Sequence, residues 1–169
     1  MVSFAYNVPE IRVNVLFLRN AASLYAIGEP ENAAKDLLAP ATAHSAGIDL
    51  RADLHDSLTV EPAERAVIPT GIAIEPLVSG IAGFIYSRSG LGAKQGLSVA
   101  QGVGVIDPDY RGELTVWLLN TSPNPITVRR GDRIAQLIFQ PFRRARFTKV
   151  ERLGNTARGQ GGFGHTGIR

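Results

Sequence analysis

The chain has 169 residues, of which 44% are hydrophobic and 20% charged, and it contains no cysteine and three widely separated histidines. This argues for one globular domain and excludes a disulfide framework, a thiolate metal site and a cysteine nucleophile, while the histidines lack metal-ligand spacing. No apolar run reaches the ~18 residues of a membrane span and no secretory pattern is visible, so we expect a cytoplasmic protein that binds no membrane.

Charge is distributed unevenly along the chain. Residues 1–128 carry 8 basic and 13 acidic side chains, whereas residues 129–169 carry 10 basic and 2 acidic ones. Such a basic tail faces an anion, which can be nucleic acid, a phosphorylated small molecule or an acidic surface on a neighbouring subunit. Because the tail has patterned glycines rather than lysine-rich blocks, we do not expect stable nucleic-acid binding.

Short β-like runs, separated by turn signals such as Asp107-Pro108, dominate the chain. Ile11–Leu18 places apolar side chains on one face and Arg12 and Asn14 on the other, which predicts a strand. Strands at this spacing predict an all-β fold, a jelly-roll-like β-barrel or sandwich. The other predicted strands are Ile48–Ala52, Ser57–Val60, Ala66–Pro69, Gly71–Glu75, Gly83–Ser87, Leu97–Val99, Val103–Ile106, Glu113–Leu119, Ile126–Val128, Arg133–Phe139 and Arg146–Val150.

Helix is expected at few positions. Glu31–Leu38 has helix-forming composition and is closed by Pro40, and Ser89–Lys94 is long enough for a single turn. The last segment, residues 154–169, holds 6 glycines in 16 residues and almost no apolar side chain, which predicts a flexible glycine-rich C-terminal arm. The expected organisation is therefore a β-barrel over residues 1–153 followed by this arm.

Two aspartates and one tripeptide are candidates for phosphate chemistry. Asp49 and Asp107 each follow an apolar residue in a β-like run, where a carboxylate can hold a magnesium-bound water or polarise a nucleophilic water. In Arg88-Ser89-Gly90, arginine offers a planar fork of donors, serine a hydroxyl and glycine close backbone approach. The alternatives are turn-capping aspartates and a polar strand-to-turn junction.

The arm carries one aromatic residue, Phe163, among glycines. It has no apolar neighbours to form a core, but an aromatic ring on a flexible arm is well suited to stacking on a nucleobase, a contact worth roughly 1–3 kcal/mol. Arg158, five residues earlier, would reach the phosphates of the same ligand. The alternative is a disordered glycine-rich tail.

Five glycine-punctuated stretches, taken in order, resemble the five motifs of the trimeric deoxyuridine triphosphate nucleotidohydrolases (dUTPases). The resemblance runs from about Ala43 to Thr166. It implies a jelly-roll barrel, a homotrimer whose sites each draw on all three subunits, and an arm that closes a neighbour's site. It also implies Mg²⁺-dependent hydrolysis of dUTP to dUMP and pyrophosphate, which supplies dUMP for thymidylate synthesis and keeps uracil out of DNA. The stretches are Ala46–Leu50, Ser87–Leu91, Gly104–Gly112, Arg130–Leu137 and Arg158–Gly167.

The same resemblance implies roles for individual residues. Asp107 would orient the water that attacks the α-phosphorus, and Tyr110 would pack against deoxyribose where a 2′-hydroxyl does not fit. Asp49 would contact Mg²⁺ through water, the metal being held mainly by the triphosphate. The remaining substrate-binding residues are Arg88, Ser89, Gly90, Gln136 and Arg158 for the phosphates, Gln101, Val105 and Ile106 in the uracil-reading hairpin, Phe163 as the stacking aromatic, and Gly164 and Thr166 in the arm.

The chain departs from the family pattern at a few positions. Ser87 stands where the family often has proline, Gln101 where some members have asparagine, and His165 where many have a hydroxyl residue; we expect His165 to face solvent. Residues 1–40 match poorly, and residues 19–40 are interpreted as an insertion.

Two other functions stay open at this point. A dCTP deaminase of the same superfamily, or a bifunctional deaminase, would carry a catalytic glutamate in the strand after Asp107, where this chain has Trp117. A non-catalytic nucleotide-binding regulatory protein would be expected to have lost Asp107 or the arm, and both are present.

Overall fold

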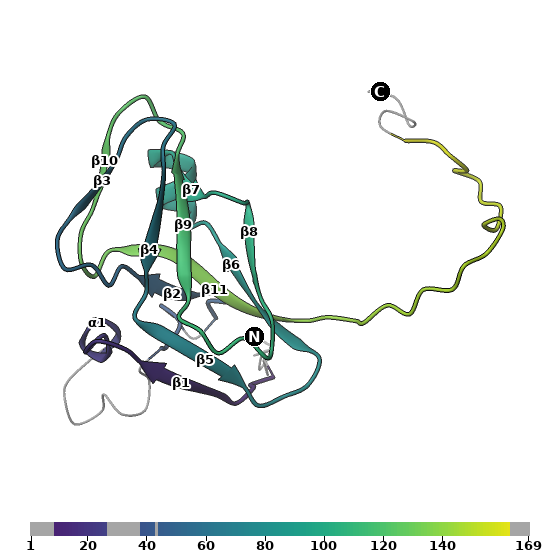
Figure 1. Ribbon diagram of the computed structural model, residues 1–169, viewed down its shortest axis with the longest axis horizontal. Helices are drawn as coiled ribbons and strands as arrows, with labels where there is room; N and C mark the ends of the chain where they lie inside the picture. Colours follow the sequence, from purple (N-terminus) through teal and green to yellow (C-terminus); the bar gives the residue numbers. More distant parts are fainter. Residues whose placement is uncertain (1–8, 27–37, 43, 163–169) are drawn as a thin grey trace, which may run out of the picture.

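Antiparallel strands form nearly all the regular structure in residues 9–26, 38–42 and 44–162, which are the residues that the computed structural model describes (Figure 1). The short helical elements in these ranges are α1 (Ala22–Tyr25) and a wide turn, η1 (Gly90–Lys94). The strands are β1 (Val13–Phe17), β2 (Ile48–Arg51), β3 (Leu58–Val60), β4 (Arg65–Pro69), β5 (Ile72–Pro76), β6 (Ile81–Tyr86), β7 (Leu97–Val99), β8 (Val103–Ile106), β9 (Thr115–Asn120), β10 (Ile126–Val128) and β11 (Arg133–Pro141).

The strands form small antiparallel sheets that wrap around one core. The largest has the order β2-β11-β6-β8, a second has the order β4-β9-β7, and the pairs β1-β5 and β3-β10 complete the enclosure (Figure 1). Non-consecutive neighbours are the rule, as expected when a chain crosses repeatedly between two layers. The predicted all-β, jelly-roll-like barrel is confirmed.

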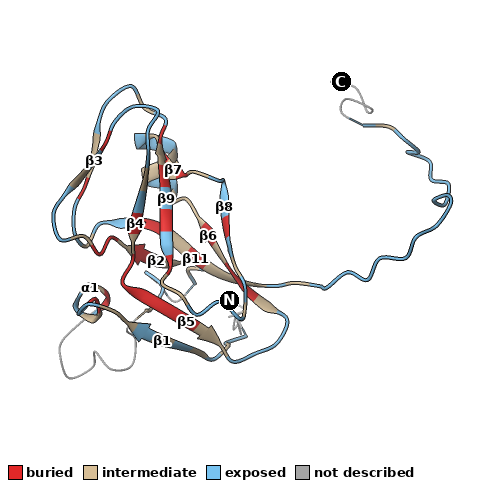
Figure 2. Ribbon diagram, in the orientation of Figure 1, coloured by how far each residue is buried: buried red, intermediate tan, exposed pale blue. Residues whose placement is uncertain are grey.

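The core follows from the alternation of side chains along each strand. In β9, Val116 and Leu118 are buried while Trp117 is 48% exposed, and Figure 2 shows both buried and exposed stretches along this strand. Each fully buried aliphatic side chain contributes about 1.5–3 kcal/mol through removal of apolar surface from water. The buried Asn120 at the end of β9 has its polar atoms satisfied: its amide nitrogen donates to the Val60 carbonyl at 2.8 Å, and its Oδ1 accepts from the Ser122 amide at 2.9 Å.

The N-terminal segment packs onto the barrel through Tyr25 of α1, a helix that the sequence analysis did not predict. The Tyr25 hydroxyl donates to the Thr70 carbonyl at 2.9 Å and accepts from the Arg51 amide at 3.1 Å. Burial raises the pKa of this phenol. One side chain therefore ties residues 22–25 to two separate parts of the barrel.

The predicted strand Arg146–Val150 is wrong. These residues lie in an extended segment that leaves the barrel after β11, and Phe147 is 93% exposed (Figure 1). A β-like pattern forms a strand only where an edge is available to supply hydrogen bonds, and this segment pairs with no described strand. The predicted helix Glu31–Leu38 lies outside the described residues except for Leu38, which is in a turn.

None of the helices in the described ranges has the length and apolar character needed to cross a membrane.

Candidate functional site

A row of polar side chains crosses three neighbouring strands of the largest sheet. In the registers of β2, β11 and β6, Gln136 lies opposite both Asp49 and Tyr86. Residues directly opposite one another in antiparallel strands point to the same face, and Arg88 follows Tyr86 by two residues. A cavity of about 320 Å³ opens here, and its lining includes Asp49, Arg88, Ser89, Gly90, Arg133 and Gln136.

The charges in this cavity are organised around Asp49. Arg88 Nε donates to Asp49 Oδ1 at 2.7 Å, and Arg133 Nη1 donates to Asp49 Oδ2 at 3.2 Å. Arg88 Nη1 also donates to the Arg133 carbonyl at 3.1 Å. Within the described residues Arg88 Nη2 has no partner, so the guanidinium is oriented by two contacts and keeps donor capacity for an anion.

Backbone contacts fix the loop that carries Arg88. Gln136 Nε2 donates to the Ser87 carbonyl at 3.0 Å, and the Ser87 hydroxyl accepts from the Val99 amide at 2.8 Å. Gly47 lies so close to Gln136 that an added Cβ would come within 3.2 Å of the Gln136 Cβ and Cδ atoms. An added Cβ at Gly47 would therefore displace the Gln136 side chain from this position. The Ser87 hydroxyl supplies a tether that proline would not provide.

A helical turn follows the arginine, as predicted for Ser89–Lys94. The Gly92 amide donates to the Arg88 carbonyl at 2.8 Å, and η1 runs from Gly90 to Lys94. Ser89 and Gly90 are exposed at its start. An added Cβ at Gly90 would meet nothing within 4 Å, which leaves open space for a ligand beside the backbone.

The second set of candidate residues lies around the turn that follows β8. Asp107 is exposed, and its carboxylate forms no hydrogen bond or ion pair with any residue that the structure describes. The Asp107 carbonyl accepts from the Tyr110 amide at 3.1 Å, which closes the turn. Tyr110 is 45% exposed, and its hydroxyl donates to the Glu113 carbonyl at 3.0 Å.

The two sets do not meet within one chain. In the β6–β8 pairing, Ile106 lies opposite Gly83, near the start of β6, whereas Arg88 follows the far end of that strand. At a rise of ~3.3 Å per residue, the five residues from Gly83 to Arg88 span about 16 Å. Asp107 and the Arg88 cavity are therefore at opposite ends of β6.

The remaining predicted residues are spread over a hairpin and the C-terminal segment. Gln101 and Val105 are exposed on the β7–β8 hairpin, and Ile106 is partly buried against the core. Arg158 is exposed, and its Nε donates to the Gly161 carbonyl at 2.9 Å in a local turn. Outside the described residues lie Phe163, Gly164, His165 and Thr166.

Comparison with known proteins identifies the family over the region that holds the five motif stretches. The family model described as dUTPase matches residues 33–167. The chain is 51% identical over 131 residues to the deoxyuridine 5'-triphosphate nucleotidohydrolase of Actinobacillus pleuropneumoniae serotype 5b, covering 78% of this chain and 87% of that protein. The chain belongs to the dUTPase family.

Two further dUTPases illustrate the similarity. The deoxyuridine 5'-triphosphate nucleotidohydrolase of Desulfitobacterium hafniense is 49% identical over 128 residues, which is 76% of this chain and 85% of that protein. A solved structure of the Staphylococcus bacteriophage 80alpha dUTPase with dUpNHpp matches with a TM-score of 0.72 at 24% identity, covering 93% of this chain and 99% of that one. The latter likeness concerns the fold.

The deaminase alternative finds no support at Trp117. This residue lies opposite Val67 in the β4–β9 pairing, and its side chain is 48% exposed on the outer face of the barrel. It offers no carboxylate to the Asp107 turn.

The dUTPase motifs include two residues whose part in the cavity was not predicted. Arg133 lies in the fourth motif stretch, and a register shift between Arg133 and Ala135 in β11 lets its side chain reach Asp49. Gly47 lies in the first stretch. Both residues lie in predicted motif stretches, but only the structure shows that Arg133 contacts Asp49 and that Gly47 lies against Gln136.

The donors in the dUTPase cavity fit a hydrated metal better than a protein-bound one. Among the described residues there is no group of three or more histidine, cysteine, aspartate or glutamate side chains that could hold an ion. Mg²⁺ usually keeps several waters and is bound through one or two carboxylates plus substrate phosphates. Asp49, in the cavity with the phosphate-binding candidates, is a carboxylate suited to such a contact.

Proposed function

We propose that this dUTPase-family chain hydrolyses dUTP to dUMP and pyrophosphate by attack of water on the α-phosphorus. The observation that carries the proposal is the gathering of Asp49, Arg88 and Gln136 in one cavity, with Asp107 and Tyr110 presented separately at the other end of β6. The first set suits a triphosphate, and the second suits a water and a sugar.

The chemistry is positioning and charge stabilisation rather than covalent catalysis. Asp107 holds the attacking water, whose oxygen bonds to the α-phosphorus while the bond from that phosphorus to the bridging oxygen breaks. Pyrophosphate leaves with the electrons of that bond, and the proton of the water passes to the Asp107 carboxylate. Arg88, Ser89 and Gln136 bind the phosphate oxygens, and Gly90 allows the backbone to approach them.

Magnesium is expected to arrive with the triphosphate. When bound, Mg²⁺ neutralises phosphate charge and restrains the triphosphate geometry. Asp49 would contact it through water while keeping Arg88 and Arg133 oriented by the ion pairs described above. The residues of this chain therefore orient the metal–substrate complex rather than enclose the metal.

The separation of the two residue sets supports a homotrimer with shared sites. About 16 Å of β6 lies between Asp107 and Arg88 within one chain, so a second subunit is needed to bring an Asp107 turn to a phosphate cavity. The C-terminal segment extends away from its own barrel (Figure 1), as an arm that reaches a neighbouring subunit would. There Arg158 would contact the γ-phosphate and Phe163, followed by Gly164 and Thr166, would close over uracil.

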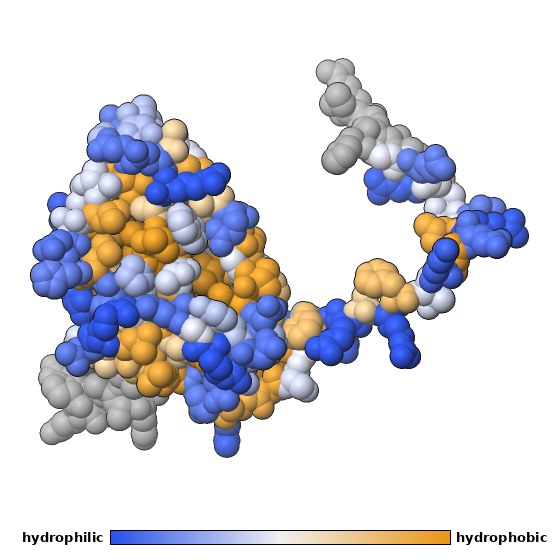
Figure 3. Space-filling view, viewed as in Figure 1, coloured by the Kyte–Doolittle hydropathy of each residue, from blue (hydrophilic) through white to orange (hydrophobic). Residues whose placement is uncertain are grey.

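Exposed apolar surface gives the oligomer a physical basis. Val67, Val105 and Trp117 are 43%, 60% and 48% exposed on the barrel, and Phe147 and Leu153 are 93% and 85% exposed on the extended segment. Figure 3 shows apolar side chains across the viewed face of the barrel and at intervals along the extended segment. Val67 and Trp117 lie opposite each other in the β4–β9 pairing, and neighbouring exposed apolar side chains of this kind mark association sites.

Specificity for deoxyuridine is assigned to two features. Tyr110 covers the sugar face where ribose would place its 2′-hydroxyl. The hairpin that carries Gln101, Val105 and Ile106 reads the uracil edge and leaves no room for a 5-methyl group.

The experiment that tests the reaction is hydrolysis of dUTP with Mg²⁺ in ¹⁸O-labelled water. Attack on the α-phosphorus places one ¹⁸O in dUMP and none in pyrophosphate, whereas label in pyrophosphate would contradict the proposed point of attack. dTTP, UTP and dCTP, tested in parallel, should be largely spared. Release of ammonia from dCTP would instead favour the deaminase.

A further inference from the structure

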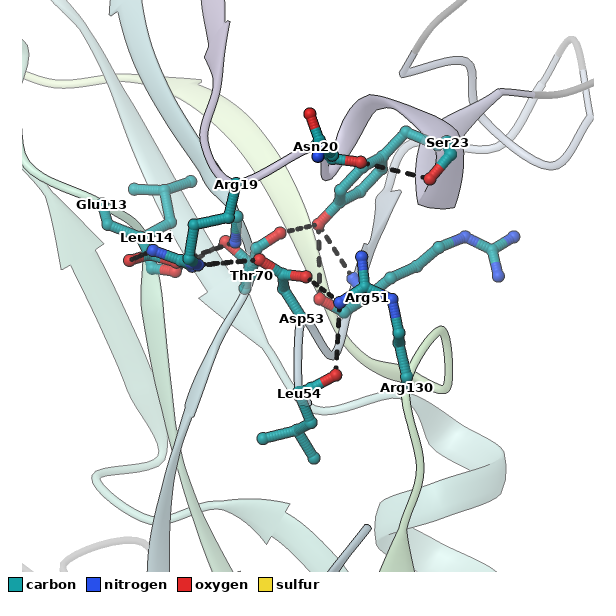
Figure 4. A network of polar contacts seen from close by, with 12 residues as sticks. Arg19, Asn20, Ser23, Arg51, Asp53, Leu54, Thr70, Glu113, Leu114 and Arg130 are labelled. Atoms are coloured by element: carbon teal, nitrogen blue, oxygen red, sulfur yellow. Dashed lines mark hydrogen bonds and ion pairs between the residues drawn. The ribbon is translucent and has the colours of Figure 1, made fainter. Parts of the chain in front are cut away.

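Arg19, outside the five motifs, joins the carboxylates of Asp53 and Glu113 (Figure 4). Its Nε donates to Asp53 Oδ2 at 3.1 Å, its Nη1 donates to Glu113 Oε2 at 3.0 Å, and its Nη2 donates to Glu113 Oε1. The Asp53 side chain is only 1% exposed. The two parallel bonds to Glu113 form a bidentate pair, which fixes orientation as well as distance.

The backbone at Arg19 is held in an unfavourable conformation. Arg19 and Asn20 have φ values of 47° and 63°, a left-handed region that residues other than glycine rarely adopt. Such conformations persist only where the surroundings impose them, and they concentrate at functional sites. Here the surroundings include the carboxylates of Asp53 and Glu113 and a hydrogen bond of 2.7 Å from the Leu18 amide to the Gly71 carbonyl.

Glu113 connects Arg19 to Tyr110 through hydrogen bonds. Its Oε1 accepts from the Gly71 amide at 2.8 Å, so that three donors hold one carboxylate. Its backbone carbonyl accepts the Tyr110 hydroxyl at 3.0 Å. Tyr110 is 45% exposed, so its ring depends on this hydroxyl contact for its position more than a buried ring would.

We propose that Arg19 is a positioning residue for sugar specificity: by holding Glu113 it holds the Tyr110 ring against the substrate, and it thereby increases discrimination between deoxyribose and ribose. The inference rests on the proposed function, because it takes Tyr110 to be the sugar-facing residue. It assigns a part in the site to the N-terminal segment.

Arg130 provides a matched control. Its Nη1 donates to the same buried carboxylate, at 2.5 Å from Asp53 Oδ1, and to the Leu54 carbonyl at 3.2 Å. It makes no contact with Glu113 among the described residues. Arg19→Gln and Arg130→Gln therefore each remove one cation from Asp53, but only Arg19→Gln releases Glu113.

The test compares kcat/KM for dUTP and for UTP, by pyrophosphate release, together with Tm for each variant. Arg19→Gln should lower the dUTP-to-UTP ratio roughly tenfold, since small displacements of positioning groups have effects of this size. Arg130→Gln should lower Tm and leave the ratio unchanged. Arg19→Lys should restore only part of the ratio, because lysine keeps the charge without the planar fork.

A double-mutant cycle with Tyr110→Phe separates positioning from general stability. Without the hydroxyl, the route from Glu113 to the ring is broken, so adding Arg19→Gln should change the ratio no further. If Arg19→Gln does not fold, Glu113→Gln serves in its place, with the same expected fall in the ratio.

An Arg19→Gln enzyme with lowered Tm but an unchanged ratio would overturn the inference and leave the function intact. So would equal losses of the ratio in Arg19→Gln and Arg130→Gln. A wild-type protein that releases no pyrophosphate from dUTP would overturn the proposed function and this inference together.

Discussion

The substitution Gly112→Ala tests the geometry around Tyr110 with a single methyl group. A Cβ at Gly112 would lie 2.6 Å from the Tyr110 Cζ atom and 3.0 Å from Cε2, whereas carbon atoms in good contact are about 3.5–4.0 Å apart. The ring must therefore retreat by about 1 Å. The hydroxyl bond to the Glu113 carbonyl, 3.0 Å long, would then stretch beyond hydrogen-bond distance.

The displacement has two consequences of different size. Loss of one hydrogen bond at an exposed site costs about 1 kcal/mol, which lowers Tm by about 2–4 °C in a chain of this length. A 1 Å misplacement of a positioning group can cost up to about 100-fold in rate. We therefore expect kcat/KM for dUTP to fall roughly 10–100-fold, with a far smaller effect on stability.

Steady-state pyrophosphate release and thermal unfolding measure the two effects. Gly154→Ala is the matched control, because a Cβ there meets nothing within 4 Å, and this variant should behave as wild type. Unchanged kcat/KM for dUTP in Gly112→Ala would refute the reasoning that the Tyr110 ring must stay where the structure places it.

Three further substitutions test other parts of the account. Asp107→Asn should nearly abolish turnover while nucleotide binding by calorimetry persists; unchanged turnover would remove Asp107 from its role. Asp53→Asn weakens two charged contacts to a buried group and should cost about 1–3 kcal/mol in urea unfolding, and a neutral result would show that the network is dispensable. Burial raises the pKa of Glu113, but hydrogen bonds from Arg19 and the Gly71 amide outweigh it and leave the pKa below its ordinary value of 4.5. The stabilisation of the folded state by the ionised Glu113 carboxylate is therefore complete above that value and is lost as pH falls through the lowered pKa. The Tm difference between wild type and Glu113→Gln should shrink below about pH 4.5. A Tm difference that does not change with pH would contradict this.

The sequence predicted the barrel well because its strands are amphipathic. In the predicted strand Ile11–Leu18 the alternation holds, because Val13, Val15 and Phe17 pack against the core while Asn14 is exposed. The failure at Arg146–Val150 has a physical cause: a pattern reports which face is apolar, but it does not report whether a partner edge exists in the same chain.

The site was predicted as a set of motifs but not as a geometry. That Gln136 faces Asp49 depends on the β2–β11 register, which is shifted by an irregularity between Arg133 and Ala135. The Arg19 network was missed altogether. In a sequence, glycine signals a left-handed backbone conformation more strongly than arginine or asparagine does. The interpretation of residues 19–40 as an insertion also drew attention away from Arg19.

The central claim, that one site is built from different subunits, is tested most directly by mixing two inactive proteins. One is the Asp107→Asn variant with its arm, and the other is residues 1–153, which keep Asp107 but lack the arm. Co-refolded in equal amounts, they should form mixed trimers in which roughly a quarter of the sites combine an intact Asp107 with an intact arm by random assortment. Recovery of about that share of wild-type dUTP hydrolysis is the predicted result; a mixture no more active than its separate components would contradict the account.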